Sequence, residues 1–322
     1  MKTTCRFLPD LALAVVAAVS LLQVPSATRA AIEPVMRTAK AAPNQMFTTT
    51  PDGVRVAIQE YGDPKGPEIV LIHGLGGTHL DWMNQVRSPV LSKYRLVTYD
   101  LRGHGLSGKP AQAAYYADGK RWGDELRAVI EAKGLKRPVL VGWSLGGLVI
   151  TNYLETHGDS RVAGIVYVDG VIELKPEYIK AKSEVVAALT SPDLATYLEG
   201  TRQFLRLCFY RQPDPETFAL LYAGAAMASP DMIKQTFTGI SVSAEATLPK
   251  VAVPSLFIYG ERDALVDART VERARQLMPK MKAILYPETG HAPFFEQPDR
   301  FNADLHRFAQ EAEKNKSVTP PR

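Results

Sequence analysis

Continuous runs of apolar residues recur along the chain, at 68–72, 94–99, 139–143, 162–168, 255–259 and 283–286. Runs of this kind, in contrast to alternating ones, are typical of strands that are buried on both faces of a parallel sheet. Helices are predicted between or after these runs, at 121–133, 148–154, 268–278 and 298–311. The alternation of strands and helices predicts an α/β fold with a mostly parallel central sheet flanked by helices.

Two stretches depart from this alternation. Residues 46–50 and 54–61 flank the turn signal Pro51-Asp52-Gly53, which predicts a pair of antiparallel strands. At 171–248 the pattern predicts a helical insert after the sixth strand. Its helices each have a proline near the first position, which suggests starts near Pro176, Pro192, Pro215 and Pro230. The insert either packs only on itself or also roofs a pocket with some of its aromatic residues and methionines.

The strand at 139–143 runs directly into a Gly-x-Ser-x-Gly sequence centred on Ser144, and a helix follows. A serine on so sharp a turn needs small residues two positions before and after it, and Gly142 and Gly146 meet that need. The hydroxyl of Ser144 is then held at the end of a strand. The N–H of Leu145 lies beside it at a helix N-terminus, where negative charge is stabilised. The pattern predicts a nucleophile elbow.

The first 30 residues differ from the rest of the chain. Lys2 and Arg6 precede an apolar run at 11–24, and small residues continue to Ala30. This is the three-part pattern of a secretory signal peptide, with an uncleaved membrane anchor as the alternative. We therefore expect export to the periplasm or the outside of the cell, and no membrane span in the mature chain. Cleavage would leave Cys208 as the one cysteine, so no internal disulfide is expected.

The remaining composition is that of an ordinary globular protein, with 322 residues of which 46% are apolar and 22% charged. The first 30 residues carry three basic side chains and one acidic one, so their removal would lower the net charge from +4 to about +2. No basic block or aromatic-interleaved basic stripe is present. The sequence therefore gives no reason to expect a nucleic-acid partner.

A serine nucleophile requires a base within hydrogen-bond reach, and six histidines are candidates. His291 follows the last strand, and the chain order Ser, Asp, His of hydrolases selects it. His73 ends a strand before a Gly-rich turn, and His104 lies between glycines in a loop. The other three are predicted at helical or flanking surface positions: His79, His157 and His306.

The base needs an acid that orients it, and three aspartates follow strands. Asp263 follows the strand at 255–259 across a turn, at the sheet edge where Ser144 is expected, and is the first candidate. Asp267 is the main rival, one helical turn later, where a helix cap is expected. Asp169, at the end of the preceding strand, is the second alternative.

The tetrahedral oxyanion of an acyl transfer needs two N–H donors. The backbone N–H of Leu145 is one. The turn after the strand at 68–72 is expected to supply the other, and Leu75 is selected because glycines on either side let the backbone come close.

Five motifs of the chain form a recognisable set. They are His73-Gly74 after a strand, Asp100 to Ser107 as D-x-R-G-H-G-x-S, Gly142 to Gly147 as G-W-S-L-G-G, Gly260 to Asp263 as G-x-x-D, and Gly290 to Pro298 as G-H-x-P-x-x-E-x-P. Over about 47–311 the set resembles the alpha/beta-hydrolase superfamily, and most of all its capped serine esterase branch. The elbow is similar to that of pimeloyl-carrier methyl esterases, although secretion argues against a carrier-protein role.

The resemblance implies Ser144 as nucleophile, His291 as base, Asp263 as acid, a helical cap at 171–248, and no cofactor or metal. Epoxide hydrolases and haloalkane dehalogenases of the superfamily use aspartate where this chain has Ser144, which disfavours their chemistries. The expected organisation is a signal peptide at 1–30, a linker at 31–44, and a hydrolase core at 45–170 and 249–311. The cap at 171–248 interrupts the core, and a flexible tail follows at 312–322.

We therefore expect a serine hydrolase that cleaves a small to medium, apolar carboxylic ester through an acyl-enzyme. The expected binding partner is this small-molecule substrate. C–C bond hydrolases, lactonases and cofactor-free perhydrolases are alternatives with the same triad. A ligand-binding protein that keeps the fold without the chemistry is an alternative of a different class.

Overall fold

The computed structural model describes residues 44–316. The predicted signal peptide at 1–30 lies outside the described residues. The same holds for the predicted linker, except for Asn44, which begins the first strand.

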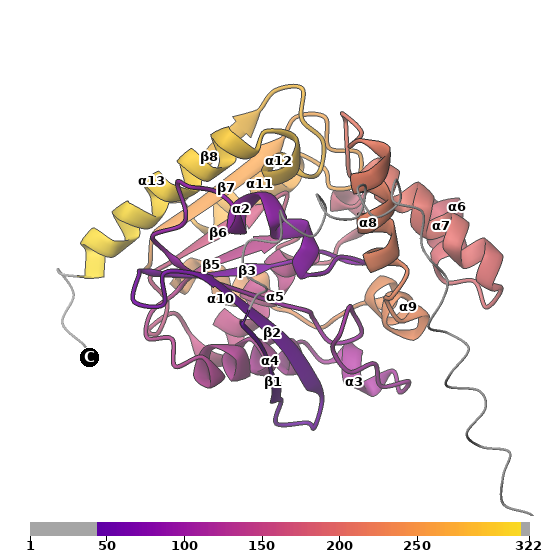
Figure 1. The fold of residues 1–322 in the computed structure, drawn as a ribbon, viewed down its shortest axis with the longest axis horizontal. Helices are drawn as coiled ribbons and strands as arrows, with labels where there is room; N and C mark the ends of the chain where they lie inside the picture. Colours follow the sequence, from indigo (N-terminus) through magenta and orange to yellow (C-terminus); the bar gives the residue numbers. More distant parts are fainter. Residues whose placement is uncertain (1–43, 317–322) are drawn as a thin grey trace, which may run out of the picture. The chain divides into compact units, whose positions relative to one another are not determined.

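Within residues 44–316 the strands form one eight-stranded sheet, in the order β1-β2-β4-β3-β5-β6-β7-β8 (Figure 1). The bounds are β1 (Asn44–Thr49), β2 (Arg55–Gly62), β3 (Glu68–Ile72), β4 (Arg95–Tyr99), β5 (Val139–Trp143), β6 (Gly164–Val168), β7 (Ser255–Gly260) and β8 (Lys282–Tyr286). Strands β3 to β8 are parallel, and β1 and β2 pair antiparallel at one edge. Each predicted strand is present, with ends that differ by two residues or fewer.

The apolar runs are continuous because the sheet is covered on both faces. In β3, Ile69 and Leu71 point into one hydrophobic core, while Val70 and Ile72 point into the other. Successive side chains of a strand point to opposite faces, so a strand between two cores needs an apolar residue at every position. The α/β fold with a mostly parallel sheet, predicted from the runs, is confirmed.

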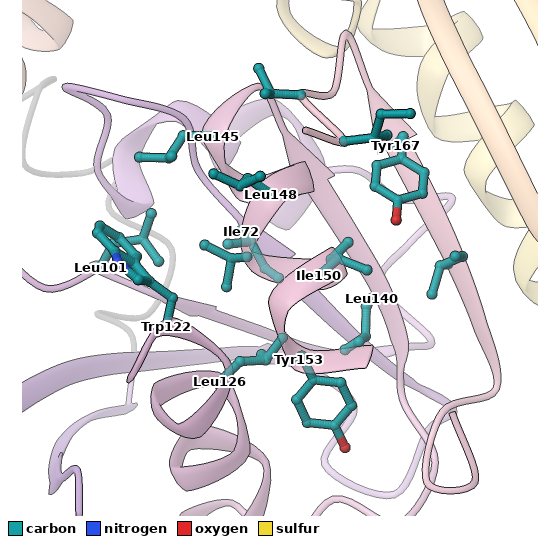
Figure 2. Packing of buried hydrophobic residues seen from close by; sticks show 14 of the residues in the cluster. Ile72, Leu101, Trp122, Leu126, Leu140, Leu145, Leu148, Ile150, Tyr153 and Tyr167 are labelled. Carbon is teal, nitrogen blue, oxygen red and sulfur yellow. The ribbon is translucent and has the colours of Figure 1, made fainter. Parts of the chain in front are cut away.

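Helices α4 (Gly119–Ala132) and α5 (Leu145–His157) cover one face of the sheet. Figure 2 shows Trp122 and Leu126 of α4 beside Leu148 and Ile150 of α5 in this core. Helix α11 (Arg269–Leu277) adds to the same core. The opposite core is covered by α13 (Pro298–Lys316) together with the short η1 (His79–Trp82), α2 (Met83–Val86) and α12 (Pro293–Glu296). A further short helix, α3 (Ala114–Ala117), precedes α4.

The segment between β6 and β7 is helical, as predicted. It holds η2 (Pro176–Tyr178), α6 (Ser183–Leu189), α7 (Leu194–Leu207), α8 (Pro215–Ala225), α9 (Pro230–Thr238), α10 (Ala244–Thr247) and η3 (Leu248–Lys250). Three of these start at the predicted prolines. Helix α7 begins two residues after Pro192, because the Asp193 side chain accepts the backbone N–H of Thr196 and makes Asp193 the cap.

The boundary of the predicted tail differs from the structure. Helix α13 continues to Lys316, so the first five residues of the tail at 312–322 are helical. The reason is packing: Ala312 is fully buried, and a Cβ added at Gly164 of β6 would lie 3.2 Å from the Ala312 Cβ. Residues 317–322 lie outside the described range. Of the helices within 44–316, none combines the length and the apolarity that a membrane crossing requires.

Candidate active site

Ser144 lies at the junction of β5 and α5, in a backbone conformation that side chains rarely adopt, with φ of 50°. The flanking glycines leave no space for a side chain: a Cβ at Gly146 would lie 2.5 Å from the Ile72 carbonyl oxygen. The Ser144 N–H donates to the Val168 carbonyl at 3.0 Å, which fixes the turn to the neighbouring strand. A non-glycine residue with positive φ is costly, so the surrounding structure must hold it in place. The strand, turn and helix are those of the predicted elbow.

The structure brings Asp263 and His291 together, from loops that follow β7 and β8. The ring Nδ1 of His291 donates to Asp263 Oδ2 at 2.7 Å, and both side chains are buried. The other oxygen, Oδ1, accepts the backbone N–H groups of Leu265 at 2.7 Å and Val266 at 3.0 Å. Three donors thus hold the Asp263 carboxylate, and its bond to Nδ1 leaves Nε2 as the basic nitrogen of His291.

Trp143, which the sequence analysis did not single out, connects the elbow to the histidine loop. Its ring Nε1 donates to the His291 carbonyl at 2.6 Å, and the two ring centroids are 5.6 Å apart. The residue immediately before Ser144 therefore fixes the backbone of His291. The signal was visible as the tryptophan of the G-W-S-L-G-G motif, but its partner is 148 residues away in the chain.

The two rival aspartates have other positions. Asp267 accepts the backbone N–H of Arg269 at 3.0 Å and pairs with its guanidinium, an interaction that lowers the pKa of Asp267. Asp267 thus lies near the start of α11, as the sequence suggested, but the N-cap residue of that helix is Ala268. Asp169, in contrast, is fully buried. One of its carboxyl oxygens lies within 4.8 Å of a carboxyl oxygen of Asp263 and of a ring nitrogen of His291.

The turn expected to supply the second oxyanion donor lies against the elbow. A Cβ added at Gly74 would be 3.0 Å from the Ser144 Cβ, and the Gly77 N–H closes the turn on the Gly74 carbonyl at 3.0 Å. The Gly76 N–H donates to His104 Nε2 at 3.1 Å, so the imidazole of His104 holds the turn in place. Leu75, Leu145 and Ser144 line one cavity.

The five remaining histidines are engaged elsewhere. His73 Nε2 accepts the N–H of Leu101 at 2.9 Å, and burial lowers the pKa of His73 to about 4 and that of His104 to about 3, so both are neutral acceptors. The other three contact partners outside the elbow: His79 pairs with Asp100, His157 with Asp124, and His306 with Tyr94. His73 and His104 therefore act as supports of the loops around Ser144, which the sequence analysis did not foresee.

The cavity beside Ser144 has a volume of about 460 Å³ and is mainly apolar. The core contributes Leu75, Leu145, Leu265 and Val266 to its lining. The insertion between β6 and β7 contributes Val171, Leu174, Pro176, Ile179, Ala181, Val186, Phe204 and Phe237. Lys175 is the charged residue of the lining, and it pairs with Glu173 at 3.2 Å. The cavity size is in the usual range for small-molecule sites.

Among the described residues, one group of side chains has donor atoms close enough together to hold a metal ion: Asp169, Asp263 and His291. Asp263 Oδ2 and His291 Nδ1 already satisfy each other at 2.7 Å, and the group is buried. We interpret the group as an acid–base cluster, because a metal would have to break the bond that orients the base.

The geometry and the fold together define a hydrolase with a nucleophile elbow. Comparison with known proteins agrees: the alpha/beta hydrolase family matches residues 69–304. A pimeloyl-[acyl-carrier protein] methyl ester esterase of Aliivibrio salmonicida is 27% identical over 253 residues, which cover 76% of this chain and 93% of that protein.

Two solved structures are also similar. A Burkholderia cenocepacia protein designated an aryl esterase is 54% identical, with a TM-score of 0.83, over 84% of this chain and 100% of that one. An esterase from Rhodococcus is 28% identical, with a TM-score of 0.76, over 83% of this chain and 98% of that one. The chain belongs to the alpha/beta hydrolase family and is an enzyme of its esterase branch. The family expected from the motifs is confirmed.

Proposed function

We propose that the protein is a serine esterase that cleaves a small to medium, largely apolar carboxylic ester through an acyl-enzyme on Ser144. The observation that carries the proposal is the elbow serine at the wall of an apolar cavity, next to a buried His291–Asp263 pair. A serine hydroxyl is a weak nucleophile without a base, and the orientation of His291 by Asp263 supplies one.

In the proposed reaction, Nε2 of His291 takes the Ser144 proton while Oγ attacks the ester carbonyl. The oxyanion is stabilised by the N–H groups of Leu75 and Leu145, and the protonated imidazole then gives its proton to the leaving alcohol. Water, deprotonated by the same nitrogen, releases the acid and restores the serine. Asp263 stabilises the imidazolium that forms in each half of the cycle.

The lining of the cavity supports an apolar substrate. Phe204, Phe237 and Val186 come from the insertion, so this segment acts as the proposed cap and forms one wall of the site. The similar protein designated an aryl esterase makes an aromatic ester a reasonable first substrate. An acyl group attached to a carrier protein is less suited, because the sequence pattern of residues 1–30 favours export, which we propose as well.

The test is hydrolysis of short p-nitrophenyl and phenyl esters by the purified mature protein and by Ser144→Ala. Loss of the serine from a comparable triad costs about a millionfold in kcat, so turnover should vanish. A fluorophosphonate should label wild type on Ser144 and leave the variant unlabelled. Ester turnover that survives in Ser144→Ala would contradict the proposal. Absence of labelling in folded wild-type protein would favour the ligand-binding alternative.

Product analysis separates the chemistries that share this triad. Diketone cleavage or peracid formation without ester turnover would identify a C–C hydrolase or a perhydrolase, and preference for cyclic esters a lactonase. Export is tested separately, by N-terminal sequencing of protein recovered from outside the cytoplasm. A mature N-terminus near residue 31 is expected, and an intact N-terminus in the membrane fraction would indicate the anchor.

A further inference from the structure

Asp169 is held at the site by its backbone. It follows the last residue of β6 directly, with φ of 42°, and its N–H donates to the Ile258 carbonyl of β7 at 2.9 Å. Positive φ at a residue other than glycine is costly and persists where the surrounding structure requires it. The strained turn fixes Asp169 at the end of β6, beside β7, the strand that leads into the loop of Asp263.

The two oxygens of Asp169 have unequal surroundings. Oδ1 accepts the N–H of Gly260 at 2.8 Å, whereas Oδ2 is buried and has no hydrogen-bond donor. Oxygens of Asp169 and Asp263 and a ring nitrogen of His291 lie within 4.8 Å of one another. Two ionised carboxylates cannot bond to each other, because both accept and neither donates.

Most titratable groups around Asp169 are acidic or neutral, and a cation close to Asp263, Lys180, donates to the backbone carbonyl of Asp263 at 2.6 Å. The titratable groups that face it are Asp263 and His291 from the loops, Tyr259 from β7, Glu296 from α12, and Cys208 from the end of α7. Burial, and then the charge of Asp263, raise the pKa of Asp169 well above its usual range. Asp263 is the better placed anion of the two, because three donors already bond to it.

We propose that Asp169 carries a proton on Oδ2, donates it in a hydrogen bond to the Asp263 carboxylate, and is the reserve anion for His291 when Asp263 cannot ionise. The inference rests on the proposed serine mechanism. Asp169 keeps its proton throughout the cycle and acts as a positioning residue, since it fixes the carboxylate that fixes the base. The shared proton satisfies the one oxygen that otherwise has no partner.

The reserve role follows from charge. Asp263→Asn removes the negative charge that opposes ionisation of Asp169, so Asp169 can lose its proton to solvent and place a carboxylate near the imidazolium of His291. Loss of the acid from a comparable triad lowers kcat about ten-thousandfold. Here the loss in Asp263→Asn should be smaller, because a negative charge remains at the site.

The first experiment is a double-mutant cycle with kcat as the readout. Asparagine can donate the same hydrogen bond and leucine cannot, so kcat should fall less in Asp169→Asn than in Asp169→Leu. Asp169→Asn combined with Asp263→Asn should be at least about tenfold slower than Asp263→Asn alone, the factor that one pKa unit of charge interaction represents. Asp267→Asn is the matched control on the same loop, and adding it to Asp263→Asn should change nothing further. Equal kcat in the single and double variants would overturn the reserve role.

The second experiment is the pH profile of kcat/KM. If Asp169 is protonated, Asp169→Asn exchanges one neutral group for another and leaves the acidic limb of the profile where it is in wild type. If Asp169 were ionised, the exchange would remove a negative charge from the site and move the acidic limb to lower pH. A downward shift therefore contradicts the proposal. Comparison of melting temperatures at neutral pH separates this effect from loss of folded protein.

A spectroscopic measurement needs no substrate. Buried Asp81 is also partly protonated at neutral pH, so the signal of Asp169 is read from the difference between two proteins. The infrared carbonyl stretch of buried, protonated carboxylic acids should lose intensity in Asp169→Asn relative to wild type. Equal intensity in the two proteins would overturn the proposal whatever the activity. Failure of the proposed function has a different signature, turnover that survives in Ser144→Ala, so the two failures are distinguishable.

Discussion

Gly146→Ala tests whether backbone crowding at the elbow sets the position of the catalytic groups. The added Cβ would lie 2.5 Å from the Ile72 carbonyl oxygen and 2.9 Å from that of His73. Ordinary contacts begin at 3.4 Å, so the helix start and the end of β3 must separate by 3.4 − 2.5 = 0.9 Å. Both crowded atoms are backbone and cannot rotate away. Because β3 leads into the turn with Leu75, the shift changes the geometry between Ser144 and the proposed oxyanion donors.

Two effects oppose each other in the stability of this variant. Alanine is favoured over glycine in a helix by about 1 kcal/mol, whereas overpacking costs about 1–3 kcal/mol. We expect a net loss of about 1 kcal/mol in the free energy of unfolding, with sterics prevailing because the contact is with backbone. A displacement near 1 Å in an active site can lower the rate about a hundredfold, and the kcat of Gly146→Ala should fall by that order.

The assay is kcat on a short p-nitrophenyl ester together with urea unfolding. Gly134→Ala is the control: its Cβ meets nothing within 4 Å, but φ is +60°, so stability alone should fall, by about 1 kcal/mol, with kcat unchanged. If Gly146→Ala keeps kcat within about threefold of wild type and unfolds normally, the crowding argument is wrong. If Gly134→Ala loses activity equally, the loss does not originate at the elbow.

Three further predictions concern Trp143, Cys208 and Asp81. Trp143→Phe removes the hydrogen bond to the His291 carbonyl, so kcat should fall about tenfold with little change in KM. This is the loss expected for one hydrogen bond of about 1 kcal/mol or slightly more. An effect confined to KM would contradict this role. Cys208 is buried with a raised pKa, so native protein should not react with a thiol reagent at mildly alkaline pH, and reaction before unfolding would contradict the burial. Burial raises the pKa of Asp81 from 3.8 to about 7. Between these two pH values the folded state binds more protons than the unfolded state. The free energy of unfolding should therefore decrease as pH rises, by at most about 1.4 kcal/mol per pH unit. Asp81→Asn should reduce this slope in urea unfolding series, and an unchanged slope would assign it to other groups.

Much of the fold could be predicted because the patterns that indicate strands and sharp turns depend only on residues close together in the chain. A strand between two cores must be apolar at every position, so the runs at 68–72 and 139–143 locate central strands without knowledge of their neighbours. Ser144 was predicted from the two glycines because the crowding of a sharp turn depends only on residues close in the chain. The end of α13 was misplaced for the opposite reason: Ala312 is buried by contact with Gly164, which local polarity does not reveal.

The sequence by itself determined the α/β fold, the elbow, and a chain order in which His291 and a preceding aspartate could serve Ser144. Tertiary structure alone decided how three aspartates divide the work. Asp267 bonds to Arg269 just before α11, Asp263 bonds to His291 Nδ1, and Asp169 is buried near Asp263 and His291. The physical reason is that a carboxyl group near a strand end can cap a helix, orient a base or hold a proton. Which of these roles a carboxyl group has depends on the hydrogen-bond donors and charges that loops distant in the chain bring close to it.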